Sequence, residues 1–213
     1  MTREISVRGN TVQLYDKGEE AWPHKFHLGC GNIYLLDYVN VDIVGELASE
    51  RPDLLTANAT TVTDYYSQRA AYTDIHHIPP RAEYLVDRRE NMLELNEPEG
   101  SVDKFICVQT LEHVKPHLGE LALRRWYEML RYHGVLILSV PDTGATVEML
   151  LDEKTCNFAI QHLAGTRKDK YSYHHNHFTP WSLELLLNSC GFMVEFLENF
   201  HRYPAIVVRA VKV

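Results

Sequence analysis

Two glycines separated by one residue, at the end of a short apolar segment, constrain the fold of this chain more than any other feature. Lys25-Phe26-His27-Leu28 has the composition of a short β-strand and runs directly into Gly29-Cys30-Gly31-Asn32. Glycines at this place let the backbone turn sharply and approach a ligand closely, because no Cβ intervenes. A strand that ends in such a turn is typical of an α/β sheet that holds a ligand at its carboxyl edge.

Further strand-like and helix-like segments alternate along the chain. Apolar residues recur at helical spacing over 118–130, where we expect Gly134 to cap the helix, and Thr179-Pro180 has the pattern of a second helix start. Strand-like segments lie at 38–43, 82–87, 102–108, 135–140, 192–197 and 205–213. The alternation predicts βαβ units and a doubly wound, mostly parallel α/β sheet.

Length and composition favour one soluble domain. We expect 1–24 to form an N-terminal arm or hairpin and 25–213 to form the domain itself. The formal net charge of -8 argues against general nucleic-acid binding, which needs a basic face. Four dispersed cysteines and the absence of a long apolar run favour the cytoplasm, without membrane insertion.

The residues suited to bind a ligand follow the strands of the predicted sheet. Asp42 and Asp87 come at the ends of two strands, and carboxylates at such places can accept both hydroxyls of a ribose. A nicotinamide-binding protein would continue the turn as G-x-G-x-x-G and then a helix, to seat a pyrophosphate. Here the third glycine is missing, so a nucleoside with an amino-acid-like tail fits better than a dinucleotide.

Four segments in order resemble the motifs of class I S-adenosylmethionine-dependent methyltransferases. They are Phe26-His27-Leu28-Gly29-Cys30-Gly31-Asn32 with Val39-Asn40-Val41-Asp42, then 101–114 with its Leu111-Glu112-His113, then 130–142, and finally 177–183 with Cys190-Gly191-Phe192. The resemblance implies a Rossmann-like methyltransferase fold with a seven-stranded-type sheet and an antiparallel closing strand. The short segment between Gly31 and Val39 resembles a compact branch with a shortened first crossover, which puts the usual first helix in doubt.

The resemblance also implies a role for each matching residue. Gly29, Cys30 and Gly31 would face the methionine part of S-adenosylmethionine, and Asp42 would accept the ribose hydroxyls. Asp87 and Arg88 would lie by the adenine, whereas Gln109 and Thr110 would line the other side of the cofactor near the sulfonium. For both aspartates the simpler alternative is a solvated acid at a strand end.

Histidines are the candidates for acceptor chemistry. His113 and His177 could orient or deprotonate a methyl acceptor, since an imidazole titrates near neutral pH, or they could only stabilise loops. His174, His175 and His177 have a spacing that suits metal ligation poorly, so no metal is expected. We expect the acceptor to be walled by 65–77, the loop after His113 and the loop 171–177, and Trp126 and Trp181 to be core residues.

The sequence therefore predicts methyl transfer from S-adenosylmethionine to a small-molecule or carbohydrate acceptor. A nicotinamide-dependent oxidoreductase on a similar sheet is the alternative enzyme. A catalytically silent cofactor-binding or scaffold protein is the third possibility, because fold alone does not specify function.

Overall fold

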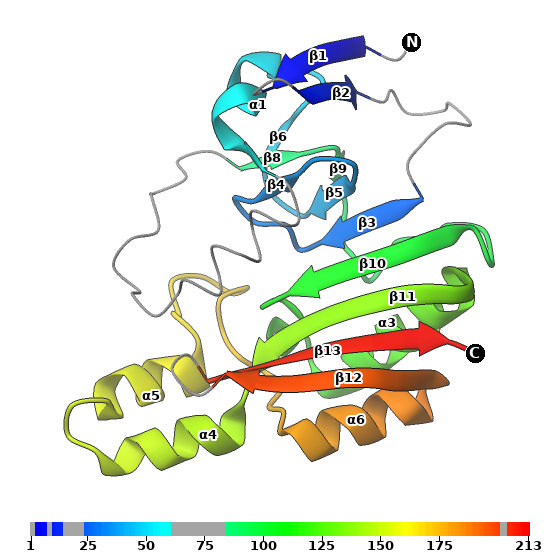
Figure 1. Ribbon diagram of the computed structural model, residues 1–213. Coiled ribbons are helices and arrows are strands. Elements are labelled where there is room, and N and C mark those ends of the chain that lie inside the picture. Colours follow the sequence, from blue (N-terminus) through cyan, green and yellow to red (C-terminus); the bar gives the residue numbers. More distant parts are fainter. Residues whose placement is uncertain (1–2, 8–9, 15–23, 61–83, 201–203) are drawn as a thin grey trace. The chain divides into compact units, whose positions relative to one another are not determined.

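The computed structural model describes residues 3–7, 10–14, 24–60, 84–200 and 204–213, and it divides into two compact units (Figure 1). The first unit is Met1–Asn96 and the second is Glu97–Val213. The expected boundary between residues 24 and 25 stays a prediction. In the first unit, β1 (Arg3–Val7) and β2 (Asn10–Leu14) pair as an antiparallel hairpin.

Three parallel strands organise the rest of the first unit. They are β3 (Lys25–Leu28), β5 (Val39–Asp42) and β9 (Arg88–Arg89), in the order β3-β5-β9. Their apolar side chains are buried, Leu28 and Val41 completely. In β3 and β5 the apolar residues alternate with His27 and Asn40, which are buried as well, and His27 Nδ1 lies 3.2 Å from Asn40 Oδ1.

The segment that joins β3 to β5 contains no helix. Residues 29–38 make turns and the two-residue strand β4 (Tyr34–Leu35), which pairs in parallel with β7 (Ala59–Thr60). Farther along, β6 (Glu46–Leu47) pairs with β8 (Leu85–Val86), and α1 (Pro52–Asn58) follows β6. A small apolar cluster holds these pieces together and consists of Tyr34, Leu36, Ala48, Leu55 and Leu85, with Leu54 against it.

Four strands form the sheet of the second unit in the order β12-β13-β11-β10. They are β10 (Val102–Val108), β11 (Leu130–Pro141), β12 (Phe192–Phe200) and β13 (Ala205–Lys212). β10 and β11 are parallel, and β13 is antiparallel to both β11 and β12. With three strands in the first unit and four in the second, the predicted seven-stranded α/β fold class with an antiparallel closing strand is confirmed.

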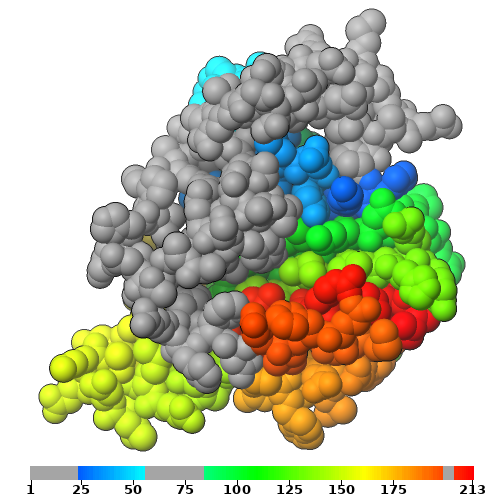
Figure 2. Space-filling model, in the orientation of Figure 1, coloured from blue at the N-terminus to red at the C-terminus, as the bar shows by residue number. Residues whose placement is uncertain are grey.

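Helices pack on the sheet of the second unit through apolar faces. α3 (Pro116–Met129) places Trp126 against Phe105 of β10, with ring centroids 5.9 Å apart, and both side chains are fully buried. α6 (Pro180–Ser189) packs against β12, and Figure 2 shows the atoms of the two elements side by side. The Thr179 hydroxyl caps α6 by accepting from Ser182 N, as the sequence predicts.

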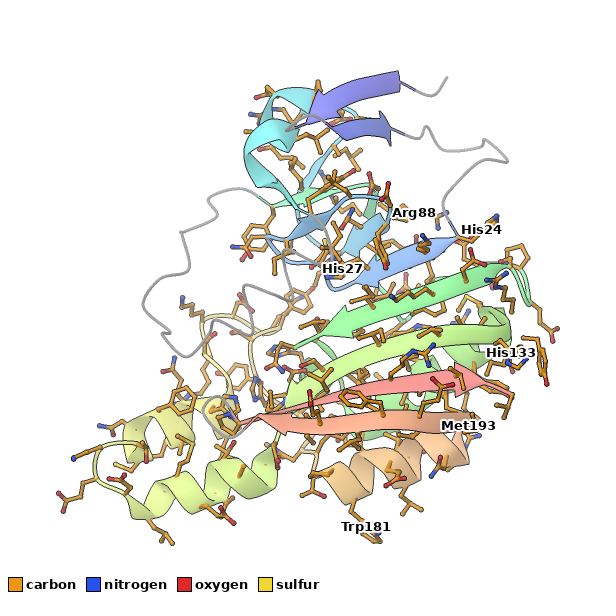
Figure 3. The ribbon with its side chains drawn as sticks, viewed as in Figure 1. His24, His27, Arg88, His133, Trp181 and Met193 are labelled. Atoms are coloured by element: carbon orange, nitrogen blue, oxygen red, sulfur yellow. The ribbon has the colours of Figure 1, made fainter. Side chains whose placement is uncertain are left out.

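Two details differ from the sequence-based expectations. The helix expected over 118–130 is α3, which ends at Met129. The strand β11 begins at the next residue, Leu130, so Gly134 lies inside β11 and does not cap the helix. A Cβ on Gly134 would lie 2.8 Å from the Arg131 carbonyl oxygen, so close packing rather than capping requires this glycine. Trp181 is 74% exposed and points away from α6 (Figure 3), which corrects its assignment to the core.

Between β11 and α6 the chain forms elements that the sequence analysis did not identify. They are α4 (Thr143–Glu148), the 3-10 helix η2 (Met149–Leu151) and α5 (Cys156–Ala164). Asp142 caps α4 by accepting from Ala145 N. Among the described residues, no helix is long and apolar enough to cross a membrane.

Candidate cofactor and acceptor site

The glycine turn after β3 needs two residues in the left-handed region. Gly29 has φ 60° and Gly31 has φ 56°, conformations that cost a residue with a Cβ more than they cost glycine. A Cβ placed on Gly31 would meet nothing within 4 Å among the described residues, so this glycine borders open space. The turn therefore presents bare backbone to whatever binds above it.

Asp42, at the end of β5, is bonded directly to this turn. Its Oδ2 accepts from Gly31 N at 2.8 Å, and its Oδ1 accepts from Ile43 N at 2.7 Å and Val44 N at 3.4 Å. The side chain is only partly buried. A carboxylate has about four lone-pair sites, so Asp42 keeps the capacity to accept from a ligand hydroxyl while these bonds fix its position.

The side chain of Cys30 belongs to the core. Cys30 is 2% exposed, and its Sγ lies 3.8 Å from the carbonyl oxygen of Leu85. Burial raises the pKa of the Cys30 thiol well above its ordinary value, with Asp42 and Asp87 adding to the effect. Only the backbone of Cys30 is therefore placed to face a ligand, and the thiol is not a nucleophile.

Asp87 holds the short crossover in place. Its Oδ1 accepts from the Tyr34 hydroxyl at 2.6 Å, and its Oδ2 accepts from Asn40 N at 2.7 Å and Asn40 Nδ2 at 3.0 Å. Burial raises the pKa of Asp87, although these hydrogen bonds oppose the rise. The neighbouring Arg88 places its guanidinium over the ring of Phe26, 5.4 Å from the centroid. Contact of Asp87 and Arg88 with adenine stays a prediction.

In the second unit, Gln109 and Thr110 follow β10 in a strained turn. Gln109 has φ 52°, unusual for a residue other than glycine, and its N donates to Ser139 O at 2.7 Å. Its Nε2 lies 3.3 Å from Ser139 Oγ, and the Thr110 hydroxyl donates to Val108 O. Backbone strain of this kind collects at ligand sites, which makes Gln109 the stronger candidate of the two.

A histidine-rich loop is bound to the turn after β10. His113 ends the 3-10 helix η1 (Leu111–His113), and its Nδ1 lies 2.9 Å from Tyr173 O. In the same contact region, His175 N and Asn176 N both donate to Glu112 O, at 2.8 and 3.0 Å. These bonds fix the loop 171–177 beside η1, which directly precedes the loop after His113. The third segment expected to wall the acceptor, 65–77, lies outside the described residues.

The histidines of this region have lowered pKa values. Burial lowers the pKa of His113, which the hydrogen bond to Tyr173 opposes. Burial also lowers the pKa of His174 to about 4, assisted by the nearby charges of His113, His162 and His177. His113 and His174 make an edge-to-face ring contact with centroids 4.9 Å apart. At neutral pH both rings are therefore uncharged, with a lone pair available.

The structure groups the predicted residues within each unit and adds two others. The glycine turn, Asp42 and the residues after β8 lie together in the first unit, whereas Gln109, Thr110, His113 and His177 belong to the second. His175 and His177 are exposed, but His174 lies beside Glu112 and His113. The sequence did not identify Glu112, 62 positions before His174, or the buried His162, 12 positions before it, as neighbours of that residue, because contacts between separate segments leave no local pattern.

Comparison with known proteins supports the fold. No protein-family model and no curated protein sequence matches the chain. Among solved structures, an S-adenosylmethionine-dependent methyltransferase from Methanosarcina mazei has a TM-score of 0.52 and 16% identity, covering 89% of this chain and 92% of that one. A 1,6-didemethyltoxoflavin N1-methyltransferase from Burkholderia thailandensis, solved with 1,6-didemethyltoxoflavin and S-adenosylhomocysteine, has a TM-score of 0.51 and 16% identity, covering 89% and 70%. The chain has the Rossmann-like fold of class I S-adenosylmethionine-dependent methyltransferases.

Proposed function

We propose that this protein transfers a methyl group from S-adenosylmethionine to a small-molecule or carbohydrate acceptor. The observation that carries the proposal is the bond between Asp42 Oδ2 and Gly31 N. It joins a strand-end carboxylate to a partly buried glycine turn, so that an acceptor for ribose hydroxyls and a backbone without side chains have a fixed relative position. A nucleoside with an amino-acid tail has the two chemical groups that this pair would bind.

Each residue of the first unit has a role in this proposal. Asp42 accepts the ribose hydroxyls, and the backbone of Gly29, Cys30 and Gly31 borders the methionine part. In this proposal Asp87 positions the short crossover, since its carboxylate accepts hydrogen bonds from Tyr34 and Asn40. Its raised pKa agrees with a buried structural role better than with an exposed one.

The second unit would supply the residues around the reacting groups. When bound, S-adenosylmethionine would supply an electrophilic methyl group on a sulfonium, which leaves as the neutral thioether of S-adenosylhomocysteine. Gln109 and Thr110 would then border the sulfonium, and His113 or His177 would orient the acceptor and take its proton. The Nδ1–H of His113 donates to Tyr173 O, so Nε2 is the nitrogen that can accept that proton.

The geometry favours this function over the nicotinamide-dependent alternative. A dinucleotide-binding turn leads into a helix whose N-terminus binds the pyrophosphate, whereas residues 29–38 contain no helix. A catalytically silent cofactor-binding protein would have the same turn, so only turnover distinguishes that alternative. The Burkholderia structure with its bound heterocycle supports a small-molecule acceptor, and four free cysteines support a cytoplasmic location.

Calorimetric titration of the full chain separates these functions. We expect saturable binding of S-adenosylhomocysteine with a rise in melting temperature, and no binding of NAD. Binding of NAD alone would establish the oxidoreductase instead. If S-adenosylhomocysteine binds but labelled S-adenosylmethionine gives no product with a panel of hydroxyl and amine acceptors, the scaffold alternative holds. A co-crystal structure with S-adenosylhomocysteine would then define the pocket above the sulfur and limit the acceptor class.

A further inference from the structure

Three side chains with metal-ligand atoms converge beside the turn after β10. Glu112 and His113 come from η1, and His174 comes from the loop before α6. One ligand atom from each lies within 4.8 Å of the other two. Because 61 residues separate His113 from His174 in the chain, the fold rather than local sequence creates this group.

We propose that Glu112, His113 and His174 bind one Zn²⁺ ion. Two imidazoles and one carboxylate are a ligand set that zinc accepts with tetrahedral geometry, leaving a fourth position for water or another small ligand. The set contains neither a thiolate nor several carboxylates, so it suits zinc better than Mg²⁺ or Ca²⁺.

The distances require only a small closure around the ion. Ligand atoms bound to a tetrahedral Zn²⁺ at about 2.0–2.2 Å lie about 3.3–3.6 Å from one another. The three atoms here lie within 4.8 Å, so none needs to approach another by more than about 1.5 Å, a shift within the reach of side-chain rotation. The backbone bonds from His175 N and Asn176 N to Glu112 O already hold the two segments together.

Hydrogen bonds orient the histidine rings for ligation. His113 Nδ1 lies 2.9 Å from Tyr173 O, which assigns the proton to Nδ1 and leaves the Nε2 lone pair for the ion. Metal-binding histidines usually donate their other ring nitrogen to a carbonyl or carboxylate in this way. His174 is held by its backbone, whose N donates to Ala164 O at 3.2 Å, and its ring contacts that of His113 edge to face.

Glu112 also fits a bound cation by its chemistry. Its side chain is 1% exposed, and one of its carboxylate oxygens belongs to the group of three converging ligand atoms. The proposal goes beyond the sequence-based expectation of no metal, which rested on the spacing within residues 174–177 and on the four dispersed cysteines.

Zinc binding is measured without cofactor or acceptor, so its outcome is independent of the proposed methyl transfer. With Zn²⁺ on Nε2 of His113, that nitrogen no longer accepts a proton, and His177 is the remaining base of the pair. Failure of zinc binding would leave the base role of His113 intact. Failure of S-adenosylhomocysteine binding would leave the zinc site intact.

The test uses the untagged full chain, freed of metal and titrated with Zn²⁺ against a chromogenic chelator. We expect one Zn²⁺ per chain, and Co²⁺ in its place should give the intense visible bands of tetrahedral coordination. Changes to groups that only orient a metal ligand typically weaken metal binding about 10- to 100-fold. His174→Ala removes a ligand itself and should weaken Zn²⁺ binding by more than that. His175→Ala, at the exposed neighbouring histidine, should leave the affinity within about twofold, like other changes away from the site.

Glu112→Gln is a second variant at a proposed ligand, chosen because it keeps the size of the side chain and removes only the charge. Circular dichroism checks that this variant is folded. Absence of stoichiometric Zn²⁺ in the unaltered chain overturns the proposal, as does an octahedral Co²⁺ spectrum. Equal weakening by His174→Ala and His175→Ala would show binding to surface histidines and overturns it too.

Discussion

Asp42→Ala tests the cofactor proposal at the residue that carries it. The substitution removes hydrogen bonds to Gly31 N at 2.8 Å and Ile43 N at 2.7 Å in the ligand-free protein. These bonds exist with and without ligand, so their loss lowers the free energy of unfolding. The proposed bonds to the ribose hydroxyls would form only in the complex, so their loss should lower the affinity.

The two effects have separate magnitudes. Loss of charge-assisted hydrogen bonds to the ribose should cost about 1–3 kcal/mol of binding free energy, which raises the Kd for S-adenosylhomocysteine about 5- to 140-fold. Loss of the two backbone bonds, at a partly exposed carboxylate, should lower the free energy of unfolding by about 1–3 kcal/mol. Asp42→Asn keeps the shape of the side chain and removes its charge. Its Kd and its free energy of unfolding should lie between those of the unaltered chain and those of Asp42→Ala.

Calorimetry gives the Kd and urea denaturation gives the stability. Asp53→Ala is the matched control, because Asp53 is an exposed carboxylate of the same unit that pairs with Arg51. The control should bind S-adenosylhomocysteine like the unaltered chain. A folded Asp42→Ala protein whose Kd stays within twofold of the unaltered value would remove Asp42 from the site and refute the argument.

Three further predictions concern stability. Tyr34→Phe removes the 2.6 Å hydrogen bond to the carboxylate after β8 and should lower the free energy of unfolding by about 1–2 kcal/mol in urea denaturation; no loss would show that the bond does not hold the crossover. Thr179→Ala removes the cap of α6 and should cost about 1 kcal/mol, which Thr179→Ser restores. Burial lowers the folded-state pKa of His162 and of His174 to about 4, below the value near 6.5 in the unfolded chain, so the unfolded state binds more protons between these values. The metal-free protein should therefore lose stability as the pH falls from about 6.5 to about 4, with a shallower slope in His162→Gln; an equal slope in this variant would contradict the argument.

Several elements could be predicted from local pattern because their determinants are local. The run over 135–140 forms part of β11, which pairs with a strand on each side, and such buried strands read as nearly continuous apolar segments. Thr179 and Pro180 specify the start of α6 through capping, which involves residues three positions apart. The positions of Asp42 and Gln109 follow from the rule that ligand-binding residues come after the strands.

Other features depend on contacts between distant segments and left no such signal. The end of α3 at Met129 follows from the pairing of Leu130 with Val102, not from Gly134. Trp181 belongs to the amphipathic helix α6 but lies on its exposed face, because Leu183 and Leu187 occupy the buried face. The grouping of Glu112 with His174 depends on how the loop before α6 folds back onto η1, which spacing within the loop does not reveal.

The anchoring of the first crossover by Asp87 has a consequence for the order of folding. Tyr34 and Asn40 reach their partner across 53 and 47 residues of chain, so the segment behind the glycine turn gains these bonds only after a long loop has closed. Closing such a loop lowers the conformational entropy of the chain before any contact compensates for the loss, and topologies of this kind fold slowly. During synthesis, the turn therefore leaves the ribosome well before the carboxylate that secures its neighbours. The glycine turn to which we assign nucleoside binding is therefore completed late in folding, when the third parallel strand has joined the first two.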